Sequence, residues 1–124
     1  MSVFVGYTPF ERPVPAHKRF LDAIAQYAPQ QQPAAQEIAL TGWIDTDLFL
    51  RGLQAAGPCP TRESYITNLR AVTNYDADGL LAAAVNLRTI QSEPTVCYWF
   101  LKISQDGKSF VPVGTRALCG SELK

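Results

Sequence analysis

A run of apolar residues at the start of the chain predicts a strand, and the helical spacing of the apolar residues after it predicts a helix. Residues 3–5 are consecutive β-branched and aromatic residues, ended by Thr8-Pro9, which is typical of a short buried strand. A proline-rich loop follows, and Pro15 suits the first position of a helix. Phe20, Ile24 and neighbouring apolar residues recur at helical spacing, so we expect an amphipathic helix that ends before residue 29.

A second predicted helix, residues 35–56, is apolar on more than one side. Its two apolar stripes consist of Leu40, Ile44 and Leu48, and of Trp43, Leu50 and Leu53. A helix that is apolar all round is buried between layers or against a partner. Gly57 and Pro58 supply the stop, and Thr61 is a favourable N-cap for a third, shorter helix.

The second half of the chain predicts less regular structure and then a hairpin. Residues 75–79 form a turn cluster, and the three alanines within residues 80–85 favour a short helix on propensity alone. Residues 96–103 are rich in aromatic and β-branched residues and predict a strand. A hairpin signal at residues 105–108 leads to a return strand at residues 110–113. The expected order is β–α–α–α–loop–β–β, an α/β fold without internal repeat.

Composition limits the possible partners. A chain of 124 residues with 47% apolar residues is the size of one domain, so residues 1–124 are expected to form a single unit. Eleven basic and eleven acidic side chains cancel, and no basic stripe argues for nucleic acid or an anionic membrane. The first residues lack the charged region and apolar stretch of a signal peptide, and their apolar run is too short to span a bilayer.

Motifs for metal or nucleophilic chemistry are incomplete. Asp76 and Asp78 resemble the opening of a calcium loop, but Val85 stands where the bidentate Glu is required. Asp45 and Asp47, two apart on a predicted helix, point to different faces and cannot act as a catalytic pair. An Asp-rich turn is therefore the favoured interpretation of residues 76–78.

The three cysteines leave alternatives open. Cys59, Cys97 and Cys119 allow one bridge and one free thiol, or three buried thiols. Without a Cys-x-x-Cys pair, and with His17 as the one histidine, the spacing does not favour zinc. A small hydrolase that pairs Cys59 or Cys97 with His17 stays open as a hypothesis, although no nucleophile motif surrounds either cysteine.

The loop after the first strand is the candidate ligand-binding segment. Tyr7, Thr8 and Phe10 leave a strand end, which is where open α/β sheets place their ligands. Two aromatic rings with a hydroxyl group suit the lining of a cleft. The alternative is that Tyr7 and Phe10 only pack the following helix.

An ordered series of short motifs covers nearly the whole chain. They are Tyr7-Thr8-Pro9-Phe10, Pro15-Ala16, Gly42-Trp43, residues 47–57, Pro60-Thr61-Arg62-Glu63, Tyr75-Asp76, Gly79-Leu80-Leu81, residues 97–100 and residues 106–113. In this order they resemble the C-terminal part of type I periplasmic binding proteins, the Leu/Ile/Val-type solute-binding proteins of ABC transporters.

The resemblance implies a fold and a function. It implies part of a two-lobed α/β fold that closes on a small organic solute, such as an amino acid, outside the cytoplasm and delivers it to a membrane permease. Such proteins are not enzymes, and the resemblance implies neither a cofactor nor a metal. It also implies a Cys97–Cys119 disulfide with Cys59 left free, a bridge worth about 3 kcal/mol on the chain-entropy model.

Two departures from the family pattern bear on partners. Ala82-Ala83-Ala84 stands where relatives carry prolines, and full members of the family are much longer, with a first half that this chain lacks. Helix faces built for that half are then expected to be exposed and to bind a partner, with Leu40, Trp43, Leu50 and Leu53 as the interface. The partner would be a second copy or a complementary N-terminal half. This gives the rival hypothesis of a non-catalytic interaction module derived from the fold.

Overall fold

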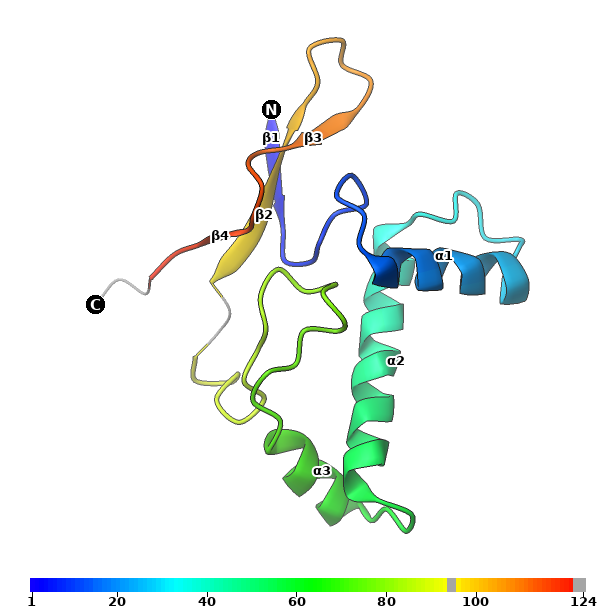
Figure 1. Cartoon of the computed structure of the whole chain (residues 1–124), viewed down its shortest axis with the longest axis vertical. Helices are drawn as coiled ribbons and strands as arrows, with labels where there is room; N and C mark the ends of the chain where they lie inside the picture. The colour runs from blue at the N-terminus through cyan, green and yellow to red at the C-terminus, as the bar shows by residue number, and fades with distance from the viewer. Residues whose placement is uncertain (94–95, 122–124) are drawn as a thin grey trace.

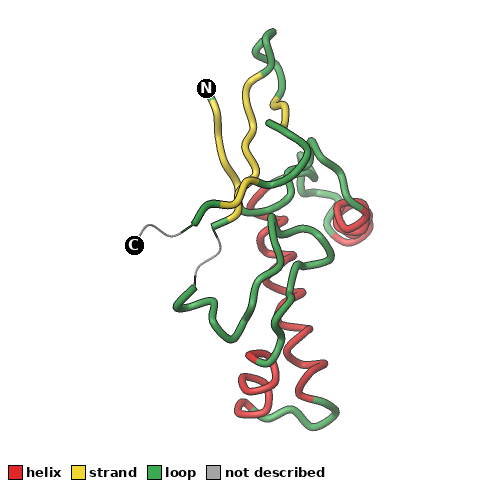
Figure 2. The backbone as a smooth tube through the Cα atoms, turned by 60° about the vertical axis from the view of Figure 1, so that its left-hand side comes forward, coloured by secondary structure: helices red, strands yellow, loops and turns green. Residues whose placement is uncertain are grey.

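A long helix runs between a short helix at its lower end and another helix at its upper end, with a small antiparallel sheet above and to the left of it (Figure 1). The structure is a computed structural model that describes residues 1–93 and 96–121. Its elements are β1 (Ser2–Val5), α1 (Pro15–Tyr27), α2 (Glu37–Ala56), α3 (Arg62–Arg70), β2 (Cys97–Ile103), β3 (Phe110–Pro112) and β4 (Leu118–Cys119). In Figure 2 the loop that follows α3 runs back alongside the long helix α2. The fold is mixed α/β, as predicted.

All three predicted helices are present with their expected boundaries. Pro15 occupies the first turn of α1, and α2 ends at Gly57, whose φ of 85° favours glycine. At α3 the Thr61 Oγ1 accepts the Ser64 N–H at 3.1 Å, while the Ser64 Oγ accepts the Thr61 N–H at 2.9 Å. Local chemistry visible in the sequence therefore sets these helix ends.

The sheet is built around β2. Strands β1 and β3 flank β2 in antiparallel register, with Val3 opposite Leu101 and Leu101 opposite Pro112. The predicted strand and hairpin are confirmed, but the two-residue strand β4, which pairs with the start of β2, had no sequence signal. Because the strands are antiparallel, the rule that places ligands at the carboxyl ends of a parallel sheet does not apply to this sheet.

The predicted helix at residues 80–85 is wrong. This segment is irregular, with a turn at Leu80 and a bend at Ala82 and Ala83. Its Leu81 and Val85 form isolated antiparallel bridges with Tyr7 and Tyr75. The Ala82 N–H donates to the Gly6 carbonyl at 3.0 Å. Alanine's helix preference is worth less than about 1 kcal/mol per residue, so these long-range backbone bonds override it.

The core lies where α1, the first half of α2 and the 75–80 turn meet. Its buried residues are Ala16, Phe20, Leu40, Tyr75, Ala77 and Leu80. The Tyr75 hydroxyl lies 2.9 Å from the Asp47 carboxylate and 3.1 Å from the Ile44 carbonyl, which ties the turn to the middle of α2. Burial, and then the charge of Asp47, raise the pKa of Tyr75. The Tyr75 hydroxyl, which stays protonated at neutral pH, therefore links the 75–80 turn to α2 at the edge of the core.

The expectation that Leu40 is exposed is wrong. Leu40 is 0% exposed, and Trp43 is half-buried with its ring 5.8 Å from the ring of Phe20 in an edge-to-face contact. Leu53 is half-buried, whereas Leu50 is 50% exposed. The first half of α2 is thus covered by α1 and the 75–87 segment of the same chain.

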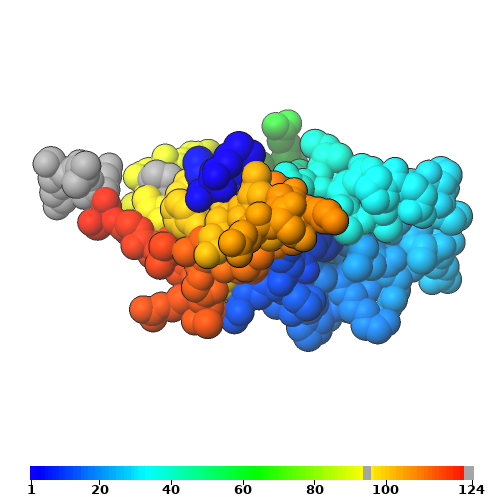
Figure 3. Space-filling model, turned by 90° about the horizontal axis from the view of Figure 1, so that it is seen from above, coloured from blue at the N-terminus to red at the C-terminus, as the bar shows by residue number. Residues whose placement is uncertain are grey.

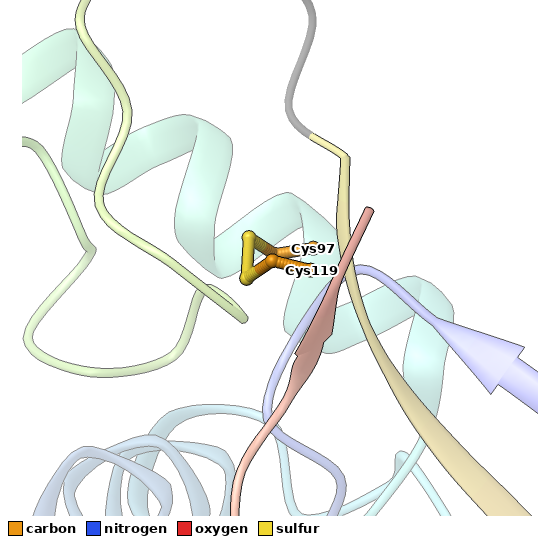
Figure 4. Close-up of a disulfide and its surroundings, with 2 residues drawn as sticks. All are labelled: Cys97 and Cys119. Carbon is orange, nitrogen blue, oxygen red and sulfur yellow. A yellow bond between two sulfur atoms is a disulfide. The ribbon is translucent and has the colours of Figure 1, made fainter. Parts of the chain in front are cut away.

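One disulfide fastens β4 to β2. It joins Cys97 to Cys119, 22 residues apart in sequence, as the resemblance implies (Figure 4). The register places the two residues directly opposite each other, and the Gly120 N–H donates to the Val96 carbonyl at 2.9 Å beside them. Cys59 is free and exposed. The covalent bond compensates for a strand too short to hold itself by hydrogen bonds alone.

Two glycines of α2 provide a matched test of the α2–α3 contact. A Cβ at Gly52 would overlap the Tyr65 ring of α3, whereas a Cβ at Gly42 meets nothing within 4 Å. We expect Gly52→Ala to lower the free energy of unfolding by about 1–3 kcal/mol through overpacking. Gly42→Ala should raise it by about 0.5–1 kcal/mol, because alanine is the better helix former. Urea unfolding followed by circular dichroism measures both, and equal effects of the two variants would contradict this packing.

Candidate ligand-binding groove

A groove of about 350 Å³ lies between the sheet, the loop after β1 and the start of α2. The antiparallel register places Val3 and Leu101 opposite each other, and Val5 lies on the same face because strand side chains alternate. Phe110 of β3 and Glu37 of α2 close the other sides. Figure 3, seen from above, shows the orange β3 hairpin reaching towards the cyan segment that leads into α2. The floor of the groove is therefore apolar.

Thr8 is a structural residue of the loop and does not line the groove. It is 4% exposed, and its Oγ1 donates to the Gly79 carbonyl at 2.7 Å. Its N–H donates to the Leu80 carbonyl at 2.7 Å, and its own carbonyl lies 2.9 Å from the His17 Nε2. All three polar groups of the predicted ligand residue Thr8 are thus used within the chain.

His17 holds the loop from the side of α1. The Val14 N–H donates to Nδ1 at 3.1 Å, so Nδ1 carries no proton, and Nε2–H donates to the Thr8 carbonyl. The ring is 2% exposed, and burial lowers the pKa of His17, against the Thr8 carbonyl and the charge of Glu11, which raise it. The loop is therefore positioned by a neutral histidine.

Phe10 fits both alternatives that the sequence left open, lining a cleft and packing against the following helix. It lines the groove, and its ring also lies 5.0 Å from the His17 ring and 6.1 Å from the Phe20 ring. Phe10 is therefore a wall residue whose position is fixed by the packing of α1.

Tyr7 is the most distinctive residue of the groove. Among residues 1–93 and 96–121, its buried hydroxyl has no partner within hydrogen-bond geometry. Burial raises the pKa of Tyr7 most. The Glu37 carboxylate, which lies close enough to attract the hydroxyl proton, raises it next, and the charge of Glu11 adds to this. A buried hydroxyl without a well-formed hydrogen bond is costly, so a small rearrangement that brings it a partner is favourable.

Two groove residues, Glu11 and Glu37, were not predicted. Glu11 directly follows Phe10 and could have been included with that loop, whereas Glu37 comes from the start of α2, far away in sequence. Both side chains are exposed, and neither forms a salt bridge with any described residue. The groove thus has an apolar floor and an acidic rim.

A larger polar depression of about 390 Å³ lies beside the 75–78 turn. Two of its three acidic side chains are engaged, because Asp47 accepts from Tyr75 and Asp78 forms an ion pair with Arg19 at 2.5 Å. Within residues 1–93 and 96–121, no three His, Cys, Asp or Glu side chains are placed to hold a metal ion. Asp76 and Asp78 belong to a turn, as the sequence favoured.

The cysteine–histidine pair of a hydrolase is not assembled. Cys97 is in a disulfide, and both ring nitrogens of His17 are bound to the backbone. Cys59 follows the far end of α2, a helix of 20 residues and therefore about 30 Å long. These residues therefore cannot supply a thiolate and its base together.

The role of His17 can be tested through pH. Because the pKa of His17 is lower in the folded than in the unfolded chain, the unfolded chain takes up a proton first as the pH falls. Its contribution to the free energy of unfolding is therefore complete above about pH 6.5 and is lost as the pH falls through the folded pKa. Urea unfolding between pH 7.5 and 4.5 should show a decline in this protein that is absent from His17→Gln. Parallel pH profiles of the two proteins would contradict the neutral buried ring.

Comparison with known proteins supports one family. No curated protein and no solved structure matches this chain. In the part of the chain that the structure describes, no helix has the length and apolar character needed to cross a membrane. The family model described as "Periplasmic binding protein" matches residues 1–108. The chain therefore belongs to the periplasmic binding protein family.

Proposed function

We propose that this chain is an extracytoplasmic solute-binding component of an ABC transporter, or a piece of one. Family membership supports a solute-binding role in general. One observation supports this groove as the binding site: the Tyr7 hydroxyl, without a partner in hydrogen-bond geometry, lies in a groove with an apolar floor. The ligand is a small organic molecule of about the size of an amino acid, and the receiving partner is a membrane permease.

The physical features of the groove suit capture without bond-making. Its volume of about 350 Å³ lies at the lower end of the range for small-molecule pockets. Val5, Phe10 and Leu101 offer apolar surface to bury, while Tyr7 offers one hydroxyl for orientation. A disulfide persists in an oxidising compartment, which agrees with a site outside the cytoplasm. We further assign the chain to the C-terminal part of the Leu/Ile/Val-type group, on the motifs from Tyr7-Thr8-Pro9-Phe10 onward.

A second candidate function is a non-catalytic interaction module. It is favoured by apolar side chains exposed at the far end of the molecule: Phe49 is 53%, Leu50 50% and Ile66 41% exposed. They lie on α2 and α3, near the half-buried Leu53, and away from the groove. The partner would be a second copy or a separate N-terminal half, with Trp43 at the margin of the contact.

Solute binding is tested by a single-atom change. Tyr7→Phe removes the unpartnered hydroxyl and keeps the ring, so the free energy of unfolding should be unchanged or raised by about 1 kcal/mol. The affinity for the solute should fall roughly tenfold, the loss expected for one hydrogen bond of about 1.4 kcal/mol. Calorimetric titration of amino acids, amines and organic acids into the purified protein gives both the ligand and its dissociation constant.

The matched control is Tyr27→Phe, since Tyr27 is 76% exposed on α1 and outside the groove. This variant should bind the solute as the unmodified protein does. Equal losses in both variants, or no heat with any member of the panel, would argue against the groove as the binding site.

The interaction module predicts an assembly at micromolar concentration. Analytical ultracentrifugation should then show a dimer or larger species that Leu50→Lys converts to a monomer, because a charge in an apolar contact is costly to desolvate. Ile38→Lys is the matched control, since Ile38 is 80% exposed near the opposite end of α2. A stable monomer at these concentrations would remove the module from consideration.

A further inference from the structure

The charges around the groove all have one sign. Glu11 and Glu37 lie among the residues that line it, and no Lys, Arg or His of the described residues does. The nearest basic residue in sequence, Arg12, is directed elsewhere, because its guanidinium lies over the Trp99 ring at 5.1 Å from the centroid. In a chain of net charge zero, this groove is a local region of negative potential.

The carboxylates of Glu11 and Glu37 both lie near the Tyr7 hydroxyl. The charges of Glu37 and Glu11 each contribute to the raised pKa of Tyr7, so both lie near its hydroxyl. Glu11 and Glu37 reach this point from two different segments, the loop after β1 and the first turn of α2. Among the described residues neither carboxylate has a basic partner within salt-bridge distance. The rim therefore presents two carboxylates without a basic partner to whatever enters, beside the buried Tyr7 hydroxyl.

We propose that the groove selects an organic amine with a short apolar body, in preference to a carboxylic acid or a zwitterionic amino acid. This rests on the proposed solute-binding function. An ammonium group supplies donors to both carboxylates, which the described residues leave without a cation. The faces of Tyr7 and Phe10 also attract a cation.

The apolar body of the amine has a place on the floor. Val3, Val5 and Leu101 form one sheet face, and a branched aliphatic chain laid on it is removed from water. A carboxylate attached to the same body would lie near Glu11 and Glu37, and like charges in a partly desolvated site repel. Selectivity then comes from repulsion as well as attraction.

Four probes with the same branched body separate the alternatives. They are 3-methylbutylamine, 3-methylbutanol, 3-methylbutyrate and leucine, each titrated calorimetrically at pH 7 and low ionic strength. We expect the amine to bind at least about tenfold more tightly than the other three, with an affinity that falls as salt is added. Glu37→Gln and Glu11→Gln should each weaken binding of the amine about tenfold and bring it close to the alcohol.

Glu93→Gln is the control, because it removes an exposed carboxylate outside the groove. It should leave the affinity for the amine unchanged. Glu37 also lies in the first turn of α2, so the circular dichroism spectrum of Glu37→Gln is compared with that of the unmodified protein. If Glu37→Gln fails to fold, Glu11→Gln decides the result, since Glu11 lies in a loop.

The outcomes distinguish this inference from the function on which it rests. Tighter or equal binding of the acid, the alcohol or leucine overturns the amine preference and leaves solute binding in place. Binding of the amine that is unaffected by Glu11→Gln and Glu37→Gln also overturns it. If none of the four probes binds, and none of the wider panel does, the solute-binding function fails and the amine preference fails with it.

Discussion

The rest of the structure depends on the way Thr8 is held. Its N–H and hydroxyl bind two carbonyls of the 79–80 turn, and its carbonyl accepts from His17 of α1. The loop after β1, the start of α1 and the distant 79–80 turn therefore meet at one buried residue, with each of its polar groups paired. Such a site tolerates little movement, because any shift would leave a buried donor or acceptor without a partner. The direction in which the chain leaves β1, and thus the position of Tyr7 and Phe10, follows from this junction.

The same junction explains why the local preference of residues 80–85 is overruled. A helix there would satisfy its own backbone and leave Thr8 and Gly6 without the partners that Leu80 and Ala82 provide. Burial of Leu80 in the core further favours this non-helical conformation of residues 80–85. This is a case in which tertiary contacts outweigh a preference that is small for each residue.

Sequence reasoning was reliable where the determinant is local. Pro15, Gly57 and Thr61 mark helix ends by their own chemistry, and the hairpin turn before Phe110 is readable in the same way. It failed for Leu40, because the cover over α2 comes from a segment about 35–40 residues later in the chain, and hydrophobic periodicity shows only that a face needs cover. In the groove, Tyr7 and Phe10 were predictable as aromatic residues at a strand end. Glu37 was not, since only the fold brings the start of α2 beside them.

The acidic rim has a cost that bears on its meaning. Two carboxylates without a basic partner among the described residues lie near each other beside a buried tyrosine hydroxyl. The raised pKa of Tyr7 reflects burial first, then the attraction of its hydroxyl to Glu37 and the negative charges of Glu37 and Glu11. A surface selected for stability alone would place a Lys or Arg near Glu11 or Glu37, and this chain has eleven such residues to place. Arg12, directly after Glu11, packs on Trp99 instead of turning to the groove. Unsatisfied groups that converge on one concave site are typical of binding sites, where the missing charge is supplied by the ligand.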